Sequence, residues 1–382
     1  MQATTPLTGL PRRARESAGG PGATGSGGSP VSSRALRWLG ALGLLGMFTS
    51  VLLVAAGAAS GPSQYVPARS GGWPSWLAGP FAGLGVGLSA DRFQALTLIM
   101  AASYLAVLLA VRALPGRMIW VTIIATHLAL LLGPPLISQD VFGYLDFARL
   151  GALHGMDPYT HVAAQVPTDP AFLFVGWPFQ NSPYGPLFTL GSYAIAPLGL
   201  ASGLWALKTL AVATSLAAIA LLSRASGNEA MSENPSAQVA VKSEEESRVF
   251  RTFLTGHSRR FTAAFVGLNP VLLELAVGGG HNDTLLLLTL AAALLFTAGA
   301  NPRLLADRRS RRSPIGGAAA LVAGIAIKVT AGLALPFLML GASGDGSSAG
   351  ERLRVVAAVA LSLALVAVIG LLGFGSHAFG FA

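Results

Sequence analysis

Long apolar runs, separated by short charged segments, are the feature that most limits what this chain can fold into. They begin near Leu36 and recur until about Leu372, and several reach the roughly 20 residues that a helix needs to cross a bilayer. Charged residues make up 11% of the 382 positions, against about 25% in a soluble domain. The core of a soluble domain could not bury so many apolar side chains, so the solvent around the helices must be lipid. The sequence predicts an all-α, polytopic integral membrane protein with about eight or nine membrane helices and no strands.

Basic residues gather at the ends of the apolar runs and set the expected orientation. The net charge is +9, but this placement is the one that fixes membrane topology, so we do not interpret it as nucleic-acid binding. Residues 1–34 predict a disordered, basic cytoplasmic tail, and residues 35–382 a membrane-embedded domain. Within that domain we expect 224–260 to be a cytoplasmic loop and the acidic segment 138–182 to lie on the outer face. The prediction is a multi-pass plasma-membrane protein.

Two stretches leave the number of crossings open. A basic loop after residue 223 requires an odd number of crossings between 183 and 223, which predicts one short non-spanning helix over 183–199 and one span over 203–222. The run 314–340 is interrupted by Lys328 and Pro336, which favours two short helices over one span. The chain has no Cys, which excludes disulfides, thiolate zinc sites and cysteine nucleophiles.

The outer segment 138–182 holds the main candidate for catalysis. A helix over 138–155 would carry Asp140, Tyr144, Phe147, Gly151 and His154 on one face. Asp146 and Arg149 would lie on the other face at a spacing that allows an ion pair, which leaves Asp140 as the acid without a local partner. An acid at a membrane boundary is often functional. The alternative for Asp140 is a helix N-cap after Ser138 and Gln139.

Two further motifs of this region have structural alternatives. Asp157 and Tyr159 flank Pro158, so a turn is as good an interpretation as a binding site. Tyr184 lies in a proline-rich segment that predicts a rigid return into the membrane, and its ring could also line a sugar or lipid pocket.

Two motifs of the second half carry polar residues between apolar runs. His281, Asn282 and Asp283 follow three glycines, and they either contact substrate or cap the helix that starts at Thr284. A His with two Asp could bind a divalent ion, but adjacent residues converge poorly on one metal, so we assign no metal ligand. Lys328 lies inside an apolar run, where a lysine needs a partner such as a phosphate or an Asp of the bundle. Its alternative is to reach out to the membrane surface.

The order of these motifs resembles a known family. Ser138-Gln139-Asp140-Val141, Tyr144, Gly155-Met156-Asp157-Pro158-Tyr159, Ser182-Pro183-Tyr184-Gly185-Pro186-Leu187, Asn269-Pro270, Gly280-His281-Asn282-Asp283 and Lys328 follow one another. This series is similar to the polyprenol-phosphomannose-dependent α-1,6-mannosyltransferases of actinobacteria, in the GT-C superfamily. The resemblance covers about 118–340 well.

The resemblance implies a mannosyltransferase of the cell envelope, of the kind that builds lipomannan. It implies a polyprenyl-phosphate-mannose donor and a lipid-linked glycan acceptor that meet on the outer face of the membrane. A β-linked donor and an α-linked product require one inversion, for which a single general base is enough. Asp140 would be that base, with Lys328 beside the donor phosphate. Tyr144 and Tyr159 would stack on sugar, and His281 and Asp283 would hold hydroxyls or phosphate. Some GT-C enzymes use a divalent metal, and the sequence does not decide this point.

Three other interpretations stay open at this stage. Members of the family continue into further helices beyond the point where this chain stops. One interpretation is therefore a C-terminally truncated, non-catalytic product. A secondary transporter would show internal repeats and midplane charges, whereas no repeat is visible and the candidate residues lie near helix ends. A third interpretation is a GT-C enzyme that uses another lipid-phosphate sugar.

Overall fold

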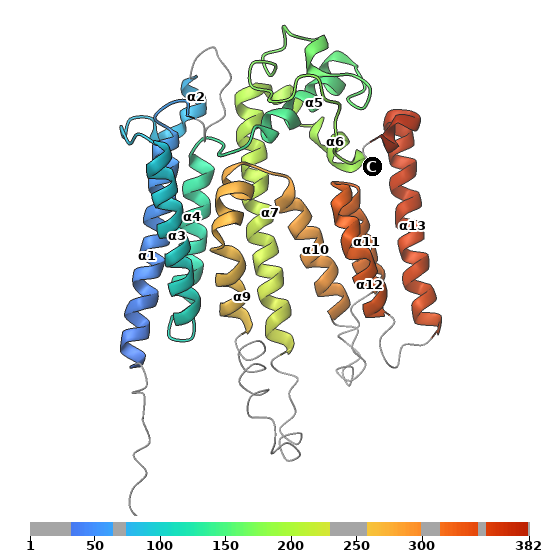
Figure 1. Cartoon of the computed structure of the whole chain (residues 1–382). Helices are drawn as coiled ribbons and strands as arrows, with labels where there is room; N and C mark the ends of the chain where they lie inside the picture. Colours follow the sequence, from blue (N-terminus) through green and yellow to red (C-terminus); the bar gives the residue numbers. More distant parts are fainter. Residues whose placement is uncertain (1–31, 64–73, 230–257, 299–313, 343–348, 381–382) are drawn as a thin grey trace, which may run out of the picture. The chain divides into compact units, whose positions relative to one another are not determined.

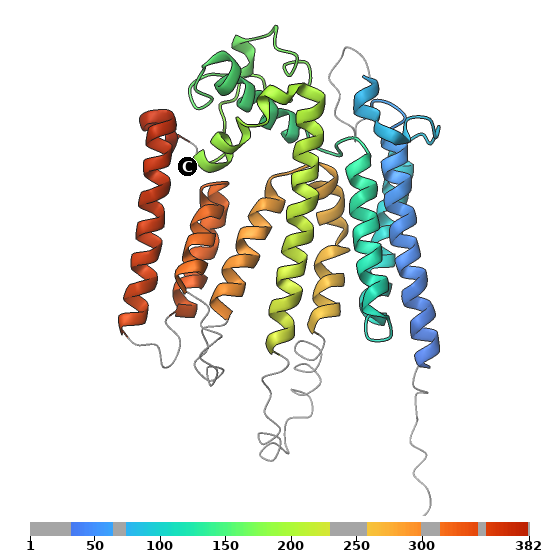
Figure 2. The same cartoon turned by 180° about the vertical axis from the view of Figure 1, so that it is seen from behind.

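The computed structural model describes residues 32–63, 74–229, 258–298, 314–342 and 349–380, and its helices are shown in Figures 1 and 2. The chain divides into two units, residues 1–32 and 33–382, and all the helices belong to the second. The described residues contain no β-strand, which confirms the all-α prediction. The predicted tail falls almost wholly outside the described residues.

The first half of the bundle is built from three long apolar helices. They are α1 (Ser33–Ala58), α3 (Ala90–Ala110) and α4 (Gly116–Leu132), with the short α2 (Ser75–Ala78) and η1 (Gly79–Phe81) before α3. Glycines let α1 approach α3 closely: a Cβ on Gly43 would lie 2.9 Å from the Ser103 carbonyl oxygen, and one on Gly46 would collide with the Ser103 hydroxyl. Small residues at such contacts are typical of helices packed in lipid.

The chain then leaves the bundle and returns to it through short elements. Helix α5 (Asp140–His154) begins after the end of α4 and ends at Gly155, which has a φ of +65°. Glycine accepts this left-handed conformation without steric cost. The short elements η2 (Ala163–Gln165), α6 (Pro186–Ser192) and η3 (Ala196–Leu198) follow. In Figures 1 and 2, α5 and α6 lie at one end of the long helices.

The second half of the bundle is centred on α7 (Gly199–Glu229), which packs against α9 and α10. Helix α9 (Ser258–Gly267) continues into the π-helical η5 (Leu272–Gly278) after a bend of 66°. The bend follows from Asn269-Pro270, since proline lacks the amide hydrogen that would continue the helix. The Asn269 side chain accepts hydrogen bonds from the backbone N–H groups of Val271 and Leu272 instead.

The remaining helices complete the unit. Helix α10 (Asp283–Ala298) packs against α11 (Pro314–Ile325), which is followed by η8 (Val329–Ala334) and α12 (Leu335–Ala342). Helix α13 (Ala349–Phe374) packs on α11 and on α6, and η9 (Gly375–Phe379) follows it. Backbone N–H groups of Gly185 and Leu187 donate to the carbonyls of Ile327 and Ala326. The start of α6 is thereby attached to the break between α11 and η8.

Most of the predicted boundaries agree with these helices, and some need correction. Within 183–199 the structure has the short elements α6 and η3, and the break at Lys328 is confirmed. However, α7 continues to Glu229, so the predicted loop 224–260 begins later, and residues 230–257 lie outside the described part. Four described helices are long and apolar enough to span a membrane, and the bent pair α9 and η5 would make a fifth. The other apolar helices have 10 to 17 residues, shorter than a typical span.

Candidate active site

Asp140 owes its position to a strained link between α4 and α5. The backbone φ of Ile137 is +68°, which is unusual for a β-branched residue and costs about 1–3 kcal/mol. The hydroxyl of Ser138 accepts the N–H of Asp140 at 3.1 Å. Asp140 is the first helical residue and Gln139 holds the cap position without a side-chain bond, so the N-cap alternative is wrong. The Asp140 carboxylate is not used to close its own helix.

The turn between η5 and α10 brings a second group of polar side chains to Asp140. His281 Nδ1 lies 3.5 Å from Asp140 Oδ2 and 3.4 Å from Asp283 Oδ2. Lys328 Nζ donates to Asp283 Oδ1 at 2.8 Å. Two carboxylates therefore flank one imidazole, and an ammonium group lies at the far end. We call these four residues the Asp140 group.

Lys328 reaches this group because the helix breaks at its position. It has extended backbone angles and precedes η8, so it lies at the junction of two short helices rather than inside a span. Its partner is an Asp of the bundle, as the sequence predicted for a lysine in an apolar run. The side chain keeps 28% of its surface exposed, so another anion can still approach the ammonium.

Tyr144 holds the turn between η5 and α10 in place. Its hydroxyl donates to Asn282 Oδ1 and accepts the Asn282 backbone N–H, both at 3.2 Å. The ring packs edge to face on Tyr184 and Phe188, with centroid distances of 4.9 and 5.0 Å. Tyr144 is 1% exposed, so its contact with Asn282 joins α5 to the turn rather than leaving the ring free to stack on a substrate.

A fully buried lysine lies beneath the same turn. Lys208 Nζ of α7 donates to the Gly133 carbonyl at 2.6 Å and lies 3.5 Å from the Gly278 carbonyl. Gly278 also accepts the N–H of Leu136 at 3.1 Å. Lys208 thus ties the end of α4 to the turn that carries His281. The sequence analysis missed it, although a lysine inside the apolar run 203–222 was the signal that could have found it.

A cavity opens in front of Asp140. It measures about 180 Å³ and is lined by Asp140, Gly143, Phe147, Val175, Trp177, Gln180, Pro183 and Tyr184. Burial and the nearby Asp140 carboxylate raise the pKa of Tyr184, so its hydroxyl stays protonated and can donate. Trp177 and Gln180 were not among the predicted site residues, because only the folded loop brings them to Asp140. The cavity combines a carboxylate, a phenol, an amide and aromatic rings.

A second, apolar groove of about 270 Å³ lies beside the Phe188 ring. Its lining is Leu187, Phe188, Gly191, Ser192, Ile195, Leu207, Leu210, Leu285 and Ile327. Ile327 precedes Lys328 in the chain, and Leu285 lies in the first turn of α10 with Asp283. The groove therefore begins next to the Lys328–Asp283 ion pair.

The predicted ion pair between Asp146 and Arg149 on the far side of α5 is wrong, because Arg149 has a different partner. Arg149 Nε donates to Asp169 at 2.8 Å rather than to Asp146, and His154 also contacts Asp169, at 2.7 Å. His154 therefore does not join Asp140, since the loop after α5 returns Asp169 to the end of the helix. Burial alone would raise the pKa of Asp169, but its hydrogen bonds from Arg149, His154 and the Ala171 N–H outweigh this and lower it.

Asp146 is left buried without a hydrogen bond to its Oδ2 among the described residues. Desolvation by burial, reinforced by the negative charge of Asp169, raises its pKa to about 7. Asp146 is a poor candidate for contact with substrate, because it is 3% exposed.

Asp157 and Tyr159 take structural places in the loop. Asp157 Oδ1 accepts the Tyr159 N–H at 2.9 Å in a side-chain turn, and Oδ2 lies 2.9 Å from His377 Nδ1 of η9. The Tyr159 hydroxyl donates to the Tyr184 carbonyl at 2.8 Å. These contacts hold Tyr184 and link the loop to the end of α13, and they correspond to the structural alternative for this motif.

Comparison with known proteins bears on the family. The sequence profile described as "Alpha-(1->6)-mannopyranosyltransferase, N-terminal domain" matches residues 40–239 and 252–344. The chain belongs to this family. Alpha-(1->6)-mannopyranosyltransferase A of Corynebacterium glutamicum is 26% identical over 226 residues, which make up 57% of this chain and 37% of that protein. The chain thus aligns with well under two thirds of that relative's length. No solved structure matches the chain.

Membership of the mannopyranosyltransferase family confirms the resemblance drawn from the ordered motifs, and with the apolar helices it indicates a membrane protein. The matched ranges include all four residues of the Asp140 group. Among the described residues no cluster of three or more His, Asp or Glu side chains is arranged to hold a metal ion.

Proposed function

We propose that the chain transfers mannose from polyprenyl-phosphate mannose to a hydroxyl of a lipid-linked cell-envelope glycan, with inversion and formation of an α-1,6 linkage. The proposal rests on the surroundings of the Asp140 carboxylate. This carboxylate lines a polar cavity, and the Asp140 group also contains a cation, Lys328, next to an apolar groove. We further propose a GT-C architecture of eight or nine membrane helices in the plasma membrane, in which the shorter apolar helices also cross.

Asp140 acts as the general base in this proposal. Its carboxylate takes the proton of the acceptor hydroxyl while the hydroxyl oxygen attacks the anomeric carbon of mannose. The bond between that carbon and the phosphate oxygen breaks, and polyprenyl phosphate leaves with the electron pair. The phosphate is a good leaving group and needs no general acid, so one base is sufficient. His281, within 3.5 Å of Asp140, orients the carboxylate.

The donor occupies the groove and the ion pair next to it. The apolar lining from Leu187 to Ile327 suits the hydrocarbon chain of a polyprenyl carrier. The phosphate then lies at Lys328, whose partly exposed ammonium neutralises the charge that builds up on the leaving group. Asp283 gives up part of its contact with Lys328 when the phosphate binds.

The acceptor glycan occupies the cavity of Asp140. Trp177, which is 47% exposed, offers a ring on which a sugar can stack. Gln180 and the Tyr184 hydroxyl hold sugar hydroxyls. Basic residues are common at the opposite ends of α1, α3 and α9, so by the positive-inside rule we expect the Asp140 group on the outer face.

Mannosyl transfer by membranes that contain the chain tests the proposal. The substrates are labelled polyprenyl-phosphate mannose and a short α-mannoside acceptor, and the variants are Asp140→Asn and, as a matched control on the same helix, Asp146→Asn. Loss of a general base costs on the order of 10²–10⁴-fold in rate. We expect this loss for Asp140→Asn and near wild-type transfer for Asp146→Asn. Equal activity of wild type and Asp140→Asn would exclude Asp140 as the base.

A further inference from the structure

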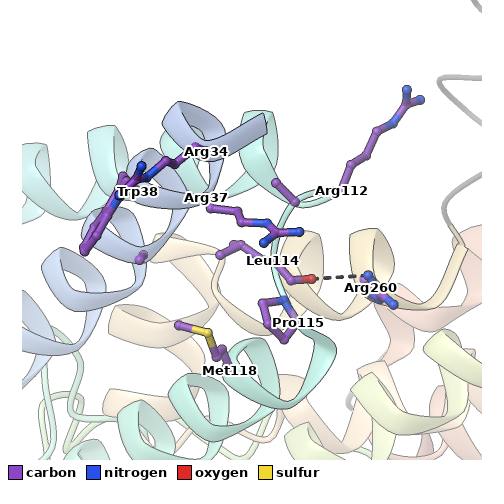
Figure 3. A pocket seen from close by; sticks show the side chains of 10 residues that line it. Arg34, Arg37, Trp38, Arg112, Leu114, Pro115, Met118 and Arg260 are labelled. Carbon is purple, nitrogen blue, oxygen red and sulfur yellow. Dashed lines mark hydrogen bonds between the residues drawn. The ribbon is translucent and has the colours of Figure 1, made fainter. Parts of the chain in front are cut away.

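A basic cleft lies at the end of the helices opposite to the Asp140 group. It measures about 580 Å³ and is lined by Arg34, Arg37, Trp38, Ala41, Arg112, Ala113, Leu114, Pro115, Met118 and Arg260. These residues come from the start of α1, the turn between α3 and α4, the first turn of α4, and the start of α9 (Figure 3). Asp140 and His281, by contrast, follow the far ends of α4 and of η5. The transfer reaction gives this cleft no role.

The cleft concentrates positive charge from three separate elements. Four of its ten lining residues are arginines, and none of the ten is acidic. Arg260 donates to the Leu114 carbonyl at 3.3 Å, which fixes its guanidinium at the cleft, as Figure 3 shows. Guanidinium groups match phosphate oxygens in geometry and charge. An anion in the cleft could accept hydrogen bonds from these guanidinium groups.

An apolar strip leads away from the cleft along α1. Arg34, Trp38, Leu42 and Leu45 share one face of the helix by their spacing. Trp38 and Leu42 are each 63% exposed, and Leu45 is 60% exposed. The strip from residue 34 to 45 is roughly 16 Å long at 1.5 Å per residue. A tryptophan between a charged end and an apolar face is typical of the membrane interface.

We propose that this cleft binds the headgroup of an anionic phospholipid, whose acyl chain lies on the Trp38–Leu45 strip. The cleft supplies the cations for the phosphate, and the strip supplies the surface for the chain. A free phosphate or a soluble acidic partner would use the arginines but not the exposed strip. The inference does not depend on the mannosyl transfer. On the orientation proposed above, the lipid belongs to the cytoplasmic leaflet.

Arginines are generally preferred at the cytoplasmic face of a membrane protein, so their presence alone does not indicate a binding site. Two arginines outside the cleft serve as the matched control. Arg117, at the start of α4, and Arg259, at the start of α9, are exposed, but they do not line the cleft. The variant Arg37→Ala/Arg260→Ala and the variant Arg117→Ala/Arg259→Ala each remove two positive charges. Only the first pair should affect a site, whereas a general surface effect should weaken binding equally in both.

The test is a lipid titration of the purified full chain in neutral detergent. The probe is phosphatidylglycerol with brominated acyl chains, read out by quenching of Trp38 fluorescence, defined as the signal lost in Trp38→Phe. Each arginine near an anionic lipid is worth roughly fivefold in affinity, so the cleft pair should weaken binding roughly 25-fold and the control pair only slightly. If the cleft pair fails to fold, Arg37→Glu takes its place in the titration. This variant leaves the Arg260 bond intact and should also weaken lipid binding.

Four results would overturn the inference. Equal weakening by the two pairs would indicate general surface charge. Phosphatidylcholine that binds as well as phosphatidylglycerol would remove the anionic headgroup from the argument. Competition by inorganic phosphate at the same concentration as the lipid would indicate a free-phosphate site. Tight binding without quenching of Trp38 would separate the lipid chain from the α1 strip.

Discussion

Replacing Tyr144 by Phe tests whether the contact between α5 and the η5–α10 turn positions the Asp140 group. The variant keeps the ring and its packing on Tyr184 and Phe188. It removes only the hydroxyl, which makes two hydrogen bonds of 3.2 Å with Asn282. Asn282 is 3% exposed, so water cannot replace the lost partner.

The expected loss follows from those two bonds. A hydrogen bond contributes about 0.5–1.5 kcal/mol net, and a buried group left without a partner costs about 1–3 kcal/mol. Both bonds are long, so we take the lower part of the range and expect about 2 kcal/mol for the free energy of unfolding. Asn282 lies between His281 and Asp283 in the chain, and a displacement of about 1 Å at a reacting group can cost roughly 10²-fold in rate. We expect a loss of kcat of that order.

The assay combines thermal unfolding in detergent with mannosyl transfer. Tyr193→Phe is the control, because the Tyr193 hydroxyl has no hydrogen bond to another described residue, and it should change neither quantity. In a double-mutant cycle, Tyr144→Phe and Asn282→Ala should be coupled by about 1 kcal/mol or more. Wild-type stability and wild-type kcat in Tyr144→Phe would refute the idea that this contact holds the site.

Three further variants test other parts of the structure. The raised pKa of Asp146, about 7 against 3.8 unfolded, means that its protonated form stabilises the fold below about pH 4. This contribution, at most about 4 kcal/mol, is lost as the pH rises to 7. The melting temperature of wild type minus that of Asp146→Asn should fall over this range, and a constant difference would contradict the pKa shift. Gly280→Ala should destabilise by about 1–2 kcal/mol in thermal unfolding, because Gly280 has a φ of +69°; an unchanged melting temperature would argue against this turn. Lys208→Met should lower mannosyl transfer with a stability change within about 2 kcal/mol, because relief of ammonium burial offsets the lost carbonyl bond, and unaltered transfer would show that the turn keeps its position without the cation.

The parts of the fold that the sequence could predict are those set by local physics. Apolar length gives the helices, and the charge of Lys328 predicts that it needs an anionic partner. The partner was one of two possibilities, a phosphate or an Asp of the bundle, and the structure has Asp283. The resemblance also brought Asp140, His281 and Lys328 into one site before any geometry was known.

Contacts that depend on how loops return could not be predicted in the same way. Asp146 and Arg149 have the right helical spacing for an ion pair, but Asp169 returns from 20 residues further along the chain and takes Arg149. Trp177 reaches Asp140 through the same loop. Lys208 carried a signal of its own, a lysine inside an apolar run, but its contacts could not be predicted because its partners are backbone carbonyls, which any sequence supplies.

The Lys328–Asp283 ion pair also dictates an order of events during biosynthesis. The two residues are 45 positions apart, and a ribosome that adds roughly 5–20 residues per second needs about 2–9 seconds to make that stretch. During this interval α10 has been synthesised, and its first residue is an acid that lacks its lysine. Until Lys328 has been made, Asp283 has only His281 beside it among the described residues, 3.4 Å away. The Asp140 group is therefore completed only when α11 and η8 have joined the bundle.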